Sequence, residues 1–142
     1  MEQKDYLLRE IEKIGAVMRA ILNRFTGNTE NLAITIEKRF EQTKEQLFDE
    51  TGLDLDEFLK LDMAETKEFI RHFKGINIVN LELLAEILFH LGVENKSGNE
   101  KFILSKALIL FELCNETDKT YSTERELKIE VIKSKVESET NY

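Results

Sequence analysis

Hydrophobic residues near the N-terminus recur every three or four positions, which is the spacing of one face of an α-helix. Between Asp5 and Phe25 they alternate in steps of four and three, a heptad pattern over three repeats. Leu8 and Leu22 widen this stripe, which favours a helix packed against two neighbours over a two-stranded coiled coil. The pattern predicts a long first helix whose apolar face is either intramolecular or a homodimer interface. The stripe consists of Leu7, Ile11, Ile14, Met18, Ile21 and Phe25.

Start and stop signals divide the next part of the chain into three helices. We expect the second helix to begin at Asn28 or Thr29 and to end before Gly52. Two acidic pairs then have the capping-box spacing, in which each side chain accepts a hydrogen bond from the other residue's backbone N–H. The pairs are Asp54 with Glu57 and Asp62 with Glu65. They predict a short helix followed by one that ends near Gly75, and capping explains all four carboxylates better than acid catalysis or metal binding does.

Two strongly apolar helices follow, the first from Asn80 to Gly92 and the second from Lys101 to Cys114. Such a hairpin cannot bury both of its faces alone, so it needs neighbours from the rest of the chain. A last helix should be capped by Ser122, or by Thr123 with Glu126. We expect this helix to bury, in part, Leu127, Ile129, Ile132 and Val136.

These elements predict one all-α domain over residues 1–138, a helical bundle of six or seven helices. Residues 1–75 would form the N-terminal helices, residues 76–138 the hairpin and the final helix, and residues 139–142 a frayed tail. The absence of Pro among the 142 residues fits this class, because nothing interrupts helix continuation.

Charge and composition narrow the class of partner. Residues 28–68 carry five basic and twelve acidic groups, which is most of the net charge of −8. An acidic surface repels phosphate backbones, so we expect no nucleic-acid partner. The chain has no uncharged apolar run near the ~20 residues that span a bilayer, so we expect no membrane partner. A single cysteine and a polar N-terminus indicate a cytoplasmic protein.

The two histidines are the only candidates for a metal site. His72 and His90 each follow a glutamate by four residues, Glu68 and Glu86, which places carboxylate and imidazole on one helix face. The spacing does not match the Glu-x-x-His of di-iron bundles, and both histidines sit in a last helical turn, where the helix dipole favours them anyway. Cys114 has no neighbouring base and indicates core packing. We therefore expect no catalytic residue, no cofactor and no metal, with a small metal- or ligand-binding protein or metal-dependent enzyme as the alternative.

The hairpin resembles a tetratricopeptide repeat. Its first helix has the spacing of that family's first helix, and its second helix has the small and large positions of the family's second. The matching residues are Leu81, Leu84, Ala85, Leu88 and Gly92, followed by Ala107, Phe111 and Cys114. The chain holds one such hairpin, with a longer loop and Lys119 in place of the family's Pro. The resemblance implies a helix-on-helix superhelical arrangement, and no groove residues carry over from it.

The opening of the chain resembles a bacterial family of uncharacterised small helical proteins. Residues 4–15 read Lys-Asp-Tyr-x-x-Arg-x-Ile-Glu-x-x-Gly, the pattern with which that family begins. The resemblance implies an all-helical, cytoplasmic bacterial protein and adds no activity. The regular apolar stripe, together with the lack of any complete catalytic constellation in the sequence, favours a non-catalytic protein–protein interaction or scaffold domain. Its partner would be another protein or a second copy of the chain.

Overall fold

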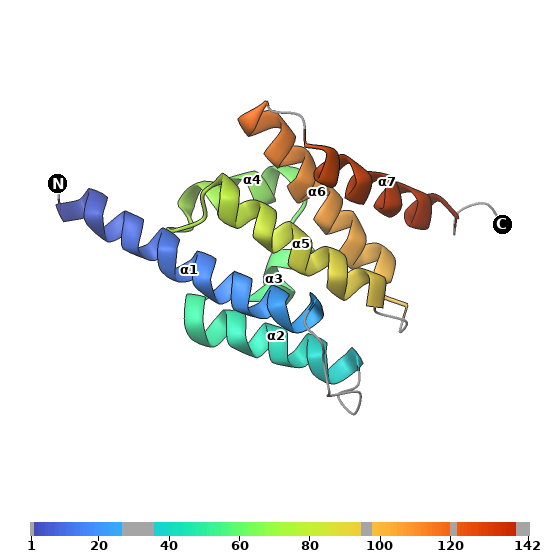
Figure 1. The fold of residues 1–142 in the computed structure, drawn as a ribbon, viewed down its shortest axis with the longest axis horizontal. Helices are drawn as coiled ribbons and strands as arrows, with labels where there is room; N and C mark the ends of the chain where they lie inside the picture. The colour runs from blue at the N-terminus through green and yellow to red at the C-terminus, as the bar shows by residue number, and fades with distance from the viewer. Residues whose placement is uncertain (1, 27–35, 95–97, 120–121, 139–142) are drawn as a thin grey trace.

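The computed structural model describes residues 2–26, 36–94, 98–119 and 122–138, and these residues form seven α-helices (Figure 1). No β-strand occurs in these ranges, so the predicted all-α helical bundle is confirmed. The helices are α1 (Glu2–Thr26), α2 (Ile36–Thr51), α3 (Leu55–Lys60), α4 (Met63–His72), α5 (Ile78–Glu94), α6 (Glu100–Asp118) and α7 (Thr123–Ser138).

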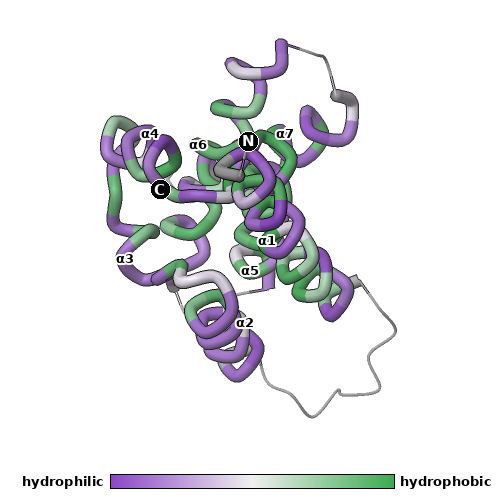
Figure 2. Tube along the Cα trace, turned by 90° about the vertical axis from the view of Figure 1, so that its left-hand side faces the viewer, coloured by the Kyte–Doolittle hydropathy of each residue, from purple (hydrophilic) through white to green (hydrophobic). Residues whose placement is uncertain are grey.

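The hairpin of α5 and α6 lies at the centre of the molecule. α1 runs alongside α5, α7 packs on α6, and α2 lies beside α1 and α3 (Figure 1). A helix that is apolar around most of its circumference is stable only when it is surrounded, and Figure 2 shows the hydrophobic residues concentrated on α5 and α6. Gly92 allows the two helices to approach closely, since a Cβ there would lie 2.6 Å from the Leu104 side chain.

The residues that resemble a tetratricopeptide repeat all face this core. Each of the eight residues is buried, from Leu81 in α5 to Cys114 in α6. These residues are apolar because they pack in the core between α1, α5, α6 and α7. The likeness to the repeat family stays a prediction.

A buried asparagine ties α1 to the start of α5. The Asn80 side-chain Nδ2 donates hydrogen bonds to the backbone oxygens of Ile11, at 2.9 Å, and Gly75, at 2.7 Å. Gly15 makes room for this contact, because a Cβ at that position would lie 2.9 Å from Asn80 Oδ1. Gly15 therefore allows a close approach between α1 and the start of α5.

The predicted acidic caps begin α3 and α4, but only the second pair forms the complete capping box. In α3, Asp54 Oδ1 accepts a hydrogen bond from Glu57 N at 3.2 Å. In α4 both halves of the capping box are present, since Asp62 Oδ1 accepts from Glu65 N at 2.8 Å and Glu65 Oε1 accepts from Asp62 N at 3.0 Å. These bonds satisfy backbone donors that would otherwise be unpaired at the helix starts.

Side chains also cap the starts of α5 and α7, and the buried face of α7 differs from the prediction at one residue. α5 begins before the expected Asn80, because Asn77 Oδ1 accepts a hydrogen bond from Asn80 N at 2.9 Å and so caps the helix. Ser122 caps α7, with its Oγ accepting from Arg125 N at 3.2 Å. The expectation that Leu127 is partly buried is wrong, since it points to solvent while Ile129 and Ile132 reach the core.

Some predictions fall on residues that the structure does not describe. These are the start of the second helix at Asn28 or Thr29 and the tail 139–142. Of the helices that are described, none combines the length and apolar character needed to cross a membrane.

Candidate interaction surface

Most of the predicted stripe on α1 is used inside the molecule. Ile14 is 1% exposed, and Met18 and Ile21 are equally buried, because this part of α1 packs along α5. Ile11 and Phe25 are half-buried, whereas Leu7 is 43% exposed. The expectation of a homodimer interface along the whole stripe is therefore corrected. The three central residues of the stripe already pack against the protein's own core. Only the N-terminal end of the stripe is open.

The open end exists because α1 extends beyond the helices that cover it. Ile11 meets Asn80, in the first turn of α5, so the turns of α1 before Ile11 pass the end of α5. Figure 1 shows this N-terminal part of α1 projecting from the body. We call residues 4–10 the overhang; at 1.5 Å per residue it is roughly 10 Å long.

Large apolar side chains are exposed on and beside the overhang. Tyr6 is 55% exposed and Leu8 is 52% exposed. Val79 is also exposed, and it lies in the first turn of α5 next to Asn80, which contacts α1. We call these three residues together with Leu7 the N-terminal patch. Exposed apolar residues that gather at one end of a molecule mark a site of interaction more often than single exposed residues do.

A shallow cavity lies on the exposed flank of α4. It has a volume of about 410 Å³ and is lined by Leu61, Glu65, Glu68, Phe69, His72 and Phe73. Its floor includes the neighbouring rings of Phe69 and Phe73, whose centroids are 5.3 Å apart, and Phe69 also packs on the buried Phe58 at 5.2 Å. We call this cavity the α4 hollow. Its rim carries two carboxylates and one imidazole.

The overhang and the α4 hollow belong to the same end of the molecule. Lys74, which follows Phe73, places its Nζ 5.8 Å from the centroid of the Tyr6 ring. At Gly75 an added Cβ would lie 3.1 Å from the carbonyl of Glu10. In Figure 2, which looks onto this end, α4 lies to the left of α1. None of the α1 side chains that the structure describes lines the hollow.

Of the four candidate metal ligands, only the two on α4 contact each other. On α4, His72 Nε2 lies 3.1 Å from Glu68 Oε1, and both side chains are exposed. On α5, Glu86 instead pairs with Lys128 at 2.9 Å. Within the described parts of the chain, no three His, Cys, Asp or Glu side chains gather as metal ligands would. The structure does not bring the four residues together.

His90 packs against an aromatic ring. Its imidazole stacks on Phe25 with a centroid distance of 5.4 Å and an interplanar angle of 15°. Burial lowers the pKa of His90, and the nearby Glu94 carboxylate opposes the shift. The Arg39 guanidinium lies over the same Phe25 ring, with its Cζ 5.5 Å from the ring centroid. Arg39 Nη1 also forms an ion pair with Glu94 Oε1 at 2.7 Å. The histidine thus joins α1 to α5 as a neutral ring.

Cys114 is fully buried in α6, as expected of a packing residue. Burial, with a smaller contribution from the carboxylate of Glu82, raises the pKa of the Cys114 thiol to about 12. A nucleophilic cysteine needs a thiolate near neutral pH. This thiol stays protonated there and contributes packing.

A buried lysine was not foreseen from the sequence. Lys106 is 2% exposed, and its Nζ donates to the Leu61 backbone oxygen at 2.7 Å and to the Thr66 hydroxyl. It also lies 4.7 Å from the centroid of the Phe58 ring. Burial lowers the pKa of Lys106 to about 8, against the opposing effect of Asp62 and Glu65. The available signal was its spacing, three residues after the buried Ile103 and four before the buried Leu110.

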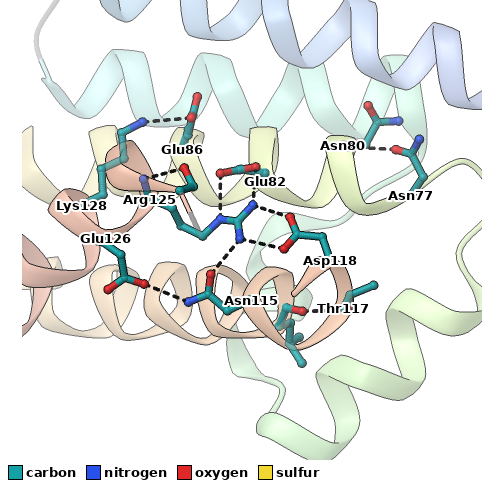
Figure 3. A network of polar contacts seen from close by, with 12 residues as sticks. Asn77, Asn80, Glu82, Glu86, Asn115, Thr117, Asp118, Arg125, Glu126 and Lys128 are labelled. Atoms are coloured by element: carbon teal, nitrogen blue, oxygen red, sulfur yellow. Dashed lines mark hydrogen bonds and ion pairs between the residues drawn. The ribbon is translucent and has the colours of Figure 1, made fainter. Parts of the chain in front are cut away.

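Arg125 is the centre of a polar network between three helices (Figure 3). It is 4% exposed, and its guanidinium bonds both carboxylate oxygens of Glu82 at 3.0 Å. It also bonds Asp118 at 2.8 and 3.3 Å, and Asn115 at 2.7 Å. Hydrogen bonds to Glu82 and Asp118 raise the pKa of Arg125 further above its ordinary value. The network joins α5, α6 and α7, and the sequence showed only a polar residue within a capping segment.

Comparisons of the chain with protein-family models, with curated proteins and with solved structures give no significant match. Function must therefore be inferred from the surfaces and side chains of this structure.

Proposed function

We propose that the protein is a non-catalytic protein-interaction domain whose docking face is the N-terminal patch of Tyr6, Leu7, Leu8 and Val79. The observation that carries this proposal is Leu7. It lies four residues before Ile11 and seven before Ile14, in register with the buried face of α1, yet it is 43% exposed. A stripe residue placed for burial and left uncovered favours a partner that covers it.

The composition of the overhang supports the same function. Solvent-exposed helical turns are ordinarily built from charged and polar residues, because these lose no hydration there. The overhang instead holds three large apolar residues in succession, Tyr6, Leu7 and Leu8. Aromatic and aliphatic side chains of this kind supply the binding energy at protein interfaces.

The roles of the reactive side chains elsewhere also support binding over catalysis. Arg125 and Lys106 are buried in contacts between helices. Cys114 is a protonated thiol in the core. Chemistry at a catalytic site needs such groups exposed to a substrate in a shared pocket.

The test compares affinity capture by three forms of the tagged protein: wild type, a Leu7→Asp/Leu8→Asp variant, and a Leu127→Asp control. Leu127 is an exposed leucine on α7, so the control places charge on an equally apolar but unrelated surface. We expect wild type and the control to capture the same protein from the source organism's lysate, or a differently tagged copy of the chain. The double variant should lose it.

Two results would contradict the proposal. One is equal capture by all three forms, which would place the docking face elsewhere. The other is capture of nothing by wild type, neither another protein nor a second copy. Equal melting temperatures of the three forms, measured by circular dichroism, show that lost capture is not lost folding.

A further inference from the structure

We propose that the partner is a second copy of the chain, and that the overhang of each copy docks into the α4 hollow of the other. This inference rests on the proposed function and names the occupant of its docking face. The α4 hollow of each copy would then be occupied by the first turns of α1 of the other copy.

The two surfaces match in chemistry. The exposed stripe of the overhang has Lys4, Leu7 and Leu8 at helical spacing of three and four, so one ammonium lies beside two leucines on a single face. The α4 hollow offers an apolar floor, which includes Phe69 and Phe73, beneath a rim with Glu65 and Glu68. Apolar residues would meet apolar residues, and a cation would meet carboxylates.

The rim carboxylates differ in their freedom to pair. Glu65 already accepts the hydrogen bond from Asp62 N that completes the α4 cap. Glu68 contacts Arg71 at 3.2 Å and His72 at 3.1 Å, and all three side chains are exposed on one helix. Exposed pairs of this kind contribute little stability, so Glu68 can exchange them for an ammonium from another chain. Glu68 is therefore the rim residue assigned to Lys4.

The arrangement on one protomer favours a second copy over an unrelated protein. α1 is continuous through the overhang, so the overhang cannot bend into its own hollow, and no described side chain of α1 lines that hollow. The two surfaces are nevertheless adjacent, because Lys74 reaches from the end of the hollow to Tyr6. A two-fold axis beside these residues would pair each overhang with the opposite hollow at once. Closed symmetric dimers use one self-complementary patch in this way.

The decisive experiment is a charge exchange between Lys4 and Glu68, read by sedimentation over protein concentrations from about 1 μM to about 1 mM. We expect wild type to form a dimer, and the single variants Lys4→Glu and Glu68→Lys each to dissociate with a Kd raised about tenfold or more, because like charges then face each other. An equimolar mixture of the two single variants should dimerise again, since each interface regains one cation and one anion. A Lys133→Glu variant on α7 is the control and should behave as wild type.

Three outcomes would overturn the inference. The first is a wild type that stays monomeric up to the highest concentration. The second is a dimer that neither single variant weakens. The third is single variants that dissociate but whose mixture does not recover, which would separate Lys4 from Glu68. If wild type is monomeric while the capture experiment still yields another protein that depends on Leu7 and Leu8, the interaction function stands and only the second copy is excluded.

Discussion

At Lys106, burial and charge oppose each other. The ammonium has two hydrogen-bond acceptors and an aromatic face, but no carboxylate in contact. The cost of desolvating a charge is therefore only partly offset, which is why its pKa falls from 10.5 to about 8. A lysine in this setting stabilises the fold less in its charged form than in its neutral form.

This imbalance predicts a pH-dependent stability. Between pH 8 and pH 10.5 the unfolded chain holds the Lys106 proton that the folded chain has released, so the contribution of this residue to stability rises with pH. Relative to a Lys106→Met variant, wild type should gain about 1 to 3 kcal/mol over that window. Urea denaturation at several pH values measures the difference.

The comparison between the two proteins removes the effect of other titrating groups. A Lys133→Met variant, changed at an exposed position of α7, serves as the control and should differ from wild type by the same amount at every pH. A flat difference for Lys106→Met as well would mean that the ammonium is hydrated in the folded protein.

At the level of helices, α7 is held in place both by apolar contacts and by the hydrogen bonds of Arg125 to Glu82 and Asp118, which we call the polar clasp. Ile129 and Ile132 bury the core side of α7, while Arg125 holds its first turn to α5 and α6. A guanidinium suits this position because its planar fork bonds two carboxylates at once. An ammonium would reach fewer acceptors.

Loss of the clasp should destabilise the protein measurably. Arg125→Met removes the guanidinium that bonds both Glu82 and Asp118 and is expected to cost about 2 to 4 kcal/mol in free energy of unfolding. The cost stays below that of fully buried pairs because the two carboxylates are 29% and 28% exposed and retain some water. Urea unfolding measures it, and Arg125→Lys should fall between the variant and wild type.

The same network supplies its own test. Combining Arg125→Met with Glu82→Gln and Asp118→Asn removes the uncompensated charges and should recover part of the lost stability. A triple variant as unstable as the sum of its single changes would show that the three residues act independently.

For the whole molecule, α1 has two parts with different expected roles. Its central residues pack against α5 and belong to the common core, whereas its first turns project beyond the body. A charged substitution should therefore destabilise the protein strongly in the central part of α1 and hardly at all in its first turns.

Ile14→Asp should abolish the cooperative unfolding of the chain, because a carboxylate at a site that is 1% exposed costs about 3 kcal/mol or more. Leu7→Asp should leave the circular dichroism spectrum and melting temperature almost unchanged. A folded Ile14→Asp protein would contradict the packing of α1 on α5 and would reopen the stripe as an interface.

Local sequence was enough to predict much of this fold. Helical spacing and caps act between residues a few positions apart, so the pairs Asp54 with Glu57 and Asp62 with Glu65 marked two helix starts correctly. The buried face of the hairpin also followed from spacing. The residues that are exposed for an interaction were predicted less well. The apolar stripe on α1 has the same spacing throughout, but its residues are exposed at one end of the helix and buried in the middle.

The tertiary structure decided which parts of these helices meet. Asn80 bonds Ile11 across 69 residues, Lys106 meets Thr66 across 40, and Arg125 meets Glu82 across 43. No local pattern encodes such contacts, since they depend on the direction in which whole helices pack. Residue order determined that α1 is a helix with one apolar face. Only the position at which α5 begins beside α1 determined that this face is covered at Ile14 and open at Leu7.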